Sequence, residues 1–149
     1  MYGFRQAVDS DYDFLFALHR ATMREYIEPI WGWHEDWQEE YFRKKFEPQK
    51  RQIIVVDGED AGVLVVEERP NEIYLGLIEL LPRFQGCGVG TSILNDLKNK
   101  AAQQKVRLSL HVLSTNIKAR RLYERFGFRA IYEESSRILM TYVPEPSRP

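Results

Sequence analysis

The chain has 149 residues, of which 44% are hydrophobic and 29% charged, a composition that fits one globular domain and excludes a disordered chain or a coiled coil. Its 21 Lys and Arg nearly balance its 22 Asp and Glu, so a net charge of −1 offers no positive field to nucleic acid. The hydrophobic runs are too short to cross a bilayer, so no membrane partner is expected either. One cysteine, Cys87, and an N-terminus without an export signal predict a cytoplasmic protein.

Two helices are predicted to follow a first strand over residues 2–7. Apolar residues recur at helical spacing from about 11 to 28, and a second helical pattern covers about 34–46. Pro29 and Gly32 interrupt the pattern between them, so this connection is expected to be a loop.

The rest of the chain alternates between strand and helix patterns. Strands are predicted over 52–57, 61–68, 72–81, 107–113, 129–134 and 137–143, with helices from Val89 and around Leu122. The resulting order, β-α-α-β-β-β-α-β-α-β-β, describes a mixed α/β fold in which a mostly antiparallel seven-stranded sheet has one parallel crossover and is accompanied by four helices. We expect a single domain over 1–143 and an extended, proline-rich tail over 144–149.

The most informative stretch is the glycine-rich turn between a predicted strand and a predicted helix, residues 85–91. Its glycines allow a ligand to approach the backbone, and the free amides of the helix start favour an anion, most naturally a pyrophosphate. A P-loop is excluded because no Gly-Lys-Ser or Gly-Lys-Thr follows, and Thr91 stands where a dinucleotide fingerprint needs its last glycine. The spacing that fits is Gln-x-x-Gly-x-Gly at Gln85, Gly88 and Gly90. A turn without a ligand is the alternative.

A second cluster, residues 116–128, follows the turn in the right order and at the right separation. With residues 80–90 it resembles the GNAT (GCN5-related) N-acetyltransferase superfamily, and the resemblance extends over nearly the whole chain. The second cluster matches at Asn116, Ala119, Leu122, Tyr123, Gly127 and Phe128. The resemblance implies the GNAT acyltransferase fold, acetyl-CoA as co-substrate without a metal, and a monomer or homodimer.

The resemblance also implies which residues hold acetyl-CoA. The backbone of Leu80 and Leu81 would bond the pantetheine arm and the acetyl carbonyl, in a gap where a bulge splays strand 72–81 from strand 107–113. Asn116 would hydrogen-bond the pantetheine region. The pyrophosphate would lie on the loop, with the side chain of Gln85 at its start and the amides of Gly86, Cys87, Gly88, Val89, Gly90 and Thr91 around it.

Acetyl transfer from a thioester to an amine leaves a thiolate that benefits from a proton. The resemblance places Tyr123 near the thioester sulfur, and a tyrosine hydroxyl can donate at neutral pH. Tyr123 is therefore the predicted general acid. The alternative is a core tyrosine whose hydroxyl bonds to backbone.

The amine must lose a proton, and a carboxylate in an apolar setting is a suitable base. Glu79, inside an apolar strand, is the candidate, although it could equally face solvent, and water remains an alternative base. Glu72 is the second candidate. His111 is expected to be a satisfied sheet histidine, and His19 and His34 are expected on helix surfaces.

The acceptor end is predicted around the connection of the first two helices, which contains all three tryptophans. Aromatic rings and carboxylates together suit a cationic amine, so Tyr26, Glu28, Trp31 and Trp33 are candidate acceptor-binding residues. Trp37, in helical register with Tyr41, is expected to be a core residue instead. The sequence leaves open whether the acceptor amine belongs to a small molecule or to a peptide.

The sequence thus predicts an N-acetyltransferase that moves an acetyl group from acetyl-CoA to a primary amine by direct attack in a ternary complex. A non-catalytic acyl-CoA-binding sensor on the same fold is the alternative. A nucleotide-binding module that uses the glycine loop is a third hypothesis, disfavoured by the missing P-loop and dinucleotide signatures.

Overall fold

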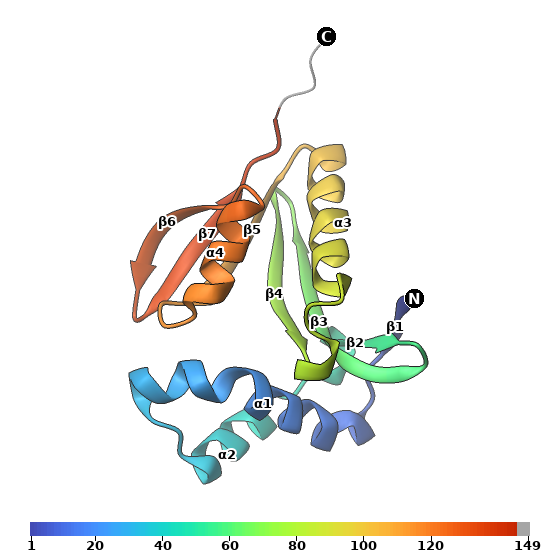
Figure 1. The fold of residues 1–149 in the computed structure, drawn as a ribbon, viewed down its shortest axis with the longest axis vertical. Helices are drawn as coiled ribbons and strands as arrows, with labels where there is room; N and C mark the ends of the chain where they lie inside the picture. The colour runs from blue at the N-terminus through green and yellow to red at the C-terminus, as the bar shows by residue number, and fades with distance from the viewer. Residues whose placement is uncertain (146–149) are drawn as a thin grey trace. The chain divides into compact units, whose positions relative to one another are not determined.

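The computed structural model describes residues 1–145, and Pro146–Pro149, most of the predicted tail, lie outside the described residues. Within 1–145 the chain forms seven strands and four α-helices in the predicted order (Figure 1). The strands are β1 (Tyr2–Gln6), β2 (Gln52–Val56), β3 (Glu59–Arg69), β4 (Glu72–Leu80), β5 (Arg107–Leu113), β6 (Arg129–Glu134) and β7 (Arg137–Tyr142). The helices are α1 (Tyr12–Trp31), α2 (Glu35–Lys45), α3 (Val89–Gln104) and α4 (Ile117–Arg125).

The strands form one sheet in the order β1-β2-β3-β4-β5-β7-β6. β1 with β2, β2 with β3, β5 with β7 and β6 with β7 pair antiparallel. β4 and β5 pair in parallel, with Glu72–Leu75 opposite Arg107–Leu110, and α3 is the crossover between them. The predicted mixed sheet, mostly antiparallel with one crossover, is therefore confirmed.

The chain divides into two units, which are described separately: residues 1–65 with 77–90, and residues 66–76 with 91 onward. β3 and β4 run through both units. The core of the first unit is built from side chains of α1, α2 and the strands, including Leu15, Phe16, Leu18, Phe42, Ile53 and Val63. In the second unit, five of the seven residues of β5 are buried, on both faces of this central strand. α3 buries its apolar stripe, as the helical period of 3.6 residues requires.

The two first helices differ from the prediction in where they end and which face they bury. α1 continues through Pro29 to Trp31, so Trp31 is helical and not in a loop. A proline this near the end removes a single amide from the ladder, and the amide of Gly32 closes the last turn on the Glu28 carbonyl at 2.9 Å.

The expectation that Trp37 packs in the core is wrong. Trp37 and Tyr41 do share a face of α2, where their rings stack at 5.0 Å, but they are 58% and 48% exposed. The buried positions of α2 are Gln38 and Phe42. The Phe42 ring packs edge-on against the rings of Tyr12 and Phe16 on α1, at 5.6 and 5.4 Å between centroids, and this ring packing fixes which face of the polar α2 turns inward.

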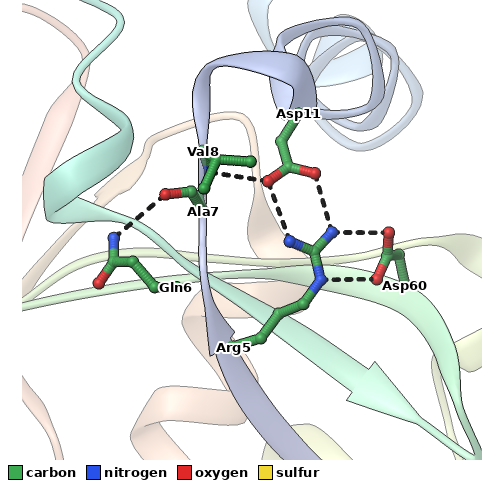
Figure 2. A network of polar contacts seen from close by, with 6 residues as sticks. All are labelled: Arg5, Gln6, Ala7, Val8, Asp11 and Asp60. Atoms are coloured by element: carbon green, nitrogen blue, oxygen red, sulfur yellow. Dashed lines mark hydrogen bonds and ion pairs between the residues drawn. The ribbon is translucent and has the colours of Figure 1, made fainter.

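A charged network ties the start of the chain to β3 (Figure 2). Arg5 on β1 donates two hydrogen bonds to the buried carboxylate of Asp11, at 2.8 and 3.0 Å, and two more to Asp60 on β3, at 2.9 and 3.2 Å. Asp11 also accepts the backbone amide of Val8 at 2.8 Å, which fixes the turn that precedes α1. The hydrogen bonds from Arg5 lower the pKa of Asp11 below its usual range.

Because the pKa of Asp11 is lowered in the folded chain, its contribution to stability is present above the ordinary aspartate pKa of about 3.9 and is lost as the pH falls through the folded value. We expect Asp11→Asn to cost about 2 kcal/mol in the free energy of unfolding at pH 7, since it weakens charge-assisted hydrogen bonds. Below pH 4 the difference from the parent should shrink. Urea denaturation at several pH values measures both effects, and Asp13→Asn, an exposed aspartate on α1, is the control. An equal effect of the two changes would remove this role from Asp11.

Candidate active site

Glu79, the predicted base, lies near the end of β4 with its side chain 3% exposed, which excludes the solvent-facing alternative. Its Oε2 atom is buried and has no hydrogen-bond partner. Burying an unpaired carboxylate is costly, so an ionised Glu79 depends on nearby positive charge.

Two side chains that can carry positive charge lie near Glu79 in the same unit. Nδ1 of His19 on α1 lies 3.5 Å from Oε2 of Glu79. Arg51, just before β2, packs its guanidinium 5.4 Å from the centre of the Phe42 ring. Burial lowers the pKa of Arg51, and the negative charge of Glu79 is the largest effect opposing that fall. Neither partner was predicted from the sequence.

His19 was expected on the helix surface, but its side chain is only 21% exposed. Its ring packs against those of Trp33 and Phe42, whose centroids lie 5.9 and 5.5 Å from its own. The signal that could have placed it is its spacing of four residues from Leu15, which is fully buried on α1.

The position of Glu79 is set by a close approach of β3. A Cβ atom on Gly62 would lie 2.1 Å from the Glu79 carbonyl oxygen, so this position has room only for glycine. Next to it, the amide of Leu81 donates to the Ala61 carbonyl at 2.9 Å. The two strands therefore fix the backbone on both sides of Leu80.

The glycine loop follows directly, between a single 3₁₀ turn (Pro82–Phe84) and α3. Gly86 and Gly88 have φ values of 75° and 89°, which favour glycine, and a Cβ at either would meet nothing within 4 Å. Their backbone therefore borders open space. The first amides of α3, from Val89 to Thr91, have no carbonyl partner within the helix. Such a turn can hold a pyrophosphate through backbone amides and the positive end of the helix dipole.

Side chains in this loop bond to its own backbone. Nε2 of Gln85 donates to the Leu80 carbonyl at 2.8 Å, and the thiol of Cys87 donates to the Phe84 carbonyl at 2.8 Å. The Leu81 carbonyl accepts the amide of Phe84. The structure thus brings Gln85 to the end of β4, beside one of the two leucines expected to contact the pantetheine arm.

In the second unit, Asn116 is the N-cap of α4 and Tyr123 lies in the last turn of that helix. Oδ1 of Asn116 caps the helix by accepting the amide of Ala119 at 3.1 Å, so its Nδ2 is the group that can donate to a ligand. The Tyr123 ring contacts Phe128 at 5.6 Å, and its carbonyl accepts the amide of Phe128 at 3.0 Å. Burial raises the pKa of Tyr123 to about 12, which keeps its hydroxyl protonated at neutral pH.

His111 on β5 bonds to the Tyr74 hydroxyl on β4 through Nδ1 at 2.6 Å. Burial lowers the pKa of His111, with a smaller effect from Arg137. It is the satisfied sheet histidine that the sequence predicts. Glu72, the second candidate base, is engaged by Arg69 and Arg107 at 2.9 and 3.2 Å.

The predicted acceptor residues lie on α1 and just after it. Glu28 pairs with Arg24 at 3.0 Å and lines an open hollow of about 630 Å³ along α1, together with Arg20, Ala21, Arg24, Glu25 and Pro29. Trp31 is 48% exposed at the end of the helix. The indole of Trp33 donates to Glu35 at 2.6 Å, which is the largest cause of the lowered pKa of that carboxyl. Burial raises the pKa of Tyr26.

Within residues 1–145, no group of three or more His, Cys, Asp or Glu side chains is arranged to hold a metal ion. No helix in the same part of the chain has both the length and the apolar character needed to span a membrane.

Residues 14–128 match the model of the acetyltransferase (GNAT) family, and the chain belongs to that family. Among curated proteins, the chain is 32% identical over 95 residues to the [ribosomal protein bS18]-alanine N-acetyltransferase of Haemophilus influenzae. That match covers 63% of this chain and spans 61% of the relative's length.

Solved structures show the same fold. PaiA N-acetyltransferase from Thermoplasma acidophilum, in complex with coenzyme A, aligns with a TM-score of 0.77 over 97% of this chain and 99% of its own, at 16% identity. The ribosomal-protein-S18-alanine N-acetyltransferase of Escherichia coli aligns with a TM-score of 0.67 over 99% and 97%, at 18% identity. The GNAT fold predicted from the sequence is confirmed.

The close approach at Gly62 generates a test. Gly62→Ala should destabilise the protein by about 2–3 kcal/mol, because the added methyl group must displace the carbonyl of Glu79 or strain the strand. Gly3→Ala on β1 is the matched control, since a Cβ there meets nothing within 4 Å. Urea denaturation compares the two. Equal stabilities would show that β3 and β4 relax apart at no cost.

Proposed function

We propose that the chain is an N-acetyltransferase that transfers an acetyl group from acetyl-CoA to a primary amine by direct attack in a ternary complex. The observation that carries the proposal is the glycine loop that opens α3, where two glycines with positive φ border open space. In this proposal residues 1–143 act as one catalytic domain, as a monomer or a homodimer.

The loop supplies the pyrophosphate site through its amides from Gly86 to Thr91. This set comprises Gly86, Cys87, Gly88, Val89, Gly90 and Thr91. The backbone of Leu80 and Leu81 serves the pantetheine arm and the acetyl carbonyl, with Gln85 at the start of the loop. The acetyl carbonyl only accepts hydrogen bonds, so it needs a backbone amide other than that of Leu81, which already donates to Ala61. The backbone carbonyls, with their second lone pair, can accept the N–H groups of the pantetheine arm. Asn116 donates to the pantetheine region through Nδ2.

Tyr123 acts as the general acid toward the departing thiolate of CoA. A hydroxyl with a pKa near 12 is a weaker acid than a thiol with an ordinary pKa of about 8.5, so complete proton transfer is uphill. A hydrogen bond that strengthens as charge develops on sulfur is enough to lower the barrier. The proton lost by the amine goes to Glu79 or to water.

The acceptor is a small-molecule or peptide amine held near Tyr26, Glu28, Trp31 and Trp33. The carboxylates and aromatic rings around α1 favour a cation before the amine is deprotonated. The names of two similar proteins make a peptide that begins with alanine the first acceptor to try. Turnover of acetyl-CoA with such a peptide and with small diamines tests the activity.

The alternative function is a sensor that binds acyl-CoA without turnover. The raised pKa of Tyr123 favours the sensor alternative, because a weaker acid gives less help to a departing thiolate. Acetyl-CoA binding without turnover of any amine in the acceptor panel would select this alternative.

The loop can be tested by placing a negative charge in the first turn of α3. Thr91→Glu should weaken acetyl-CoA binding at least about 10-fold, because a carboxylate there opposes the pyrophosphate. Thermal stability should be retained, since the same carboxylate interacts favourably with the helix dipole. Asn99→Glu, about 12 Å farther along the same helix, is the control for charge. Calorimetry giving equal affinities for the two variants would exclude the loop as the pyrophosphate site.

Tyr123→Phe keeps the ring and removes the hydroxyl. We expect kcat to fall by about 10²-fold, the low end for a general acid, while the dissociation constant of acetyl-CoA changes little. Tyr132→Phe on β6, where the side chain is exposed, should leave both unchanged. A kcat within twofold of the parent would remove Tyr123 from the mechanism, and a large loss of affinity would make it a binding residue.

A further inference from the structure

His19 lies close to Glu79 and is a further candidate for the base, besides Glu79 itself and water. Oε2 of Glu79 is buried without a hydrogen bond, and Nδ1 of His19 is 3.5 Å away. That distance exceeds a good hydrogen bond, but catalytic contacts in ligand-free enzymes are often long and tighten when substrate binds.

The imidazole is oriented by its neighbours. The rings of Trp33 and Phe42 lie 5.9 and 5.5 Å from it, from two different elements. With Nδ1 toward Glu79, Nε2 is on the opposite edge of the ring. The side chain of His19 is 21% exposed, whereas that of Glu79 is 3% exposed, so His19 is the member of the pair that reaches solvent.

Charged groups from each neighbouring element act on the pair. Glu79 contributes a negative charge from β4, and Arg51 contributes a positive charge from the segment before β2. Beyond Trp33, Glu35 on α2 is ion-paired with Arg20 on α1. Of these, Glu79 is the carboxylate close enough to stabilise a protonated His19 directly.

We propose that Glu79 and His19 work as a carboxylate–imidazole pair in which His19 is the catalytic base and Glu79 is its positioning residue. This inference rests on the proposed acetyltransferase function. Nε2 of His19 accepts a proton from the ammonium group of the acceptor, so one N–H bond breaks and another forms. The neutral amine then attacks the thioester carbonyl, a C–N bond forms, the C–S bond breaks, and the second proton that the nitrogen loses goes to the departing CoA thiolate. The imidazolium, stabilised by Glu79, returns its proton to water.

The arrangement explains why a carboxylate is buried where it contacts no solvent. A buried acid that holds a histidine in one tautomer and stabilises its protonated form is a known device of nucleophilic enzymes. As a direct base, Glu79 would need the amine to reach an atom that is almost fully covered. As a positioning residue, it needs only His19.

An NMR titration tests the interaction of His19 with Glu79 without measuring catalysis. The carbon-bound proton signals of His19 are followed by NMR against pH in the parent chain and in Glu79→Gln, with His19→Gln used for assignment. If the pair is as proposed, the His19 midpoint should be lower in Glu79→Gln than in the parent, because the negative charge beside the imidazole is gone. The exposed His34 provides the internal control and should not move. An unchanged His19 midpoint would overturn the pair.

A second experiment tests catalysis with an alanine-initiated peptide and 1,4-diaminobutane as acceptors. His19→Gln should lower kcat by about 10²-fold and remove the acid limb of the pH–rate profile, and Glu79→Gln should move that limb to lower pH. His34→Gln should match the parent. If His19→Gln is as active as the parent, His19 is not the base.

The double variant His19→Gln/Glu79→Gln should be no slower than His19→Gln alone, because both residues act through one proton transfer. A further large loss would mean that Glu79 acts independently of His19 and would overturn the assignment.

Calorimetry of acetyl-CoA binding distinguishes failure of the His19–Glu79 pair from failure of the proposed function. If the His19 midpoint is the same in the parent and in Glu79→Gln while the parent binds and turns over acetyl-CoA, only the His19–Glu79 pair is rejected. If the parent neither binds nor turns over acetyl-CoA, the proposed function itself is rejected.

Discussion

The contact between β3 and β4 at Gly62 is the constraint on which the candidate site depends. A side chain at this position would collide with the backbone of Glu79, so the two strands can approach this closely only through glycine. The amide of Leu81 then pairs with Ala61, and the chain leaves β4 directly into the glycine loop. A carboxylate, a strand end and a glycine-rich turn are therefore placed within a few residues by one close backbone approach.

The glycine loop and Glu79 lie close together in the sequence but in different electrostatic environments. The loop borders open space, where backbone amides and a helix dipole can act on an anion without the cost of burying a charge. Glu79 lies in the apolar interior, where a charge is costly unless a partner is near. His19 and Arg51 are those partners, and aromatic rings hold both of them. Local interactions suffice for the loop, whereas the environment of Glu79 depends on side chains from three distant parts of the sequence.

This difference explains what could be predicted from the sequence. The strands and the glycine loop follow from patterns within a few neighbouring residues. The two clusters at 80–90 and 116–128 identified the family, which the comparisons show. The direction that α2 faces could not be predicted, because Trp37 and Phe42 are both aromatic and ring packing with α1 decides between them. His19 was missed for a related reason. Its partner is 60 positions away, and only the folded chain brings them together.

β6 has a consequence for self-association. It forms one edge of the sheet, and all six of its residues are exposed. Another strand can pair with an exposed edge strand. β6 carries the charged residues Arg129, Glu133 and Glu134. Its register with β7 is irregular between Ala130 and Tyr132. Charges and a broken register both oppose regular strand addition. The charges and the irregular register thus make this edge a poor template for regular, fibre-like stacking of copies.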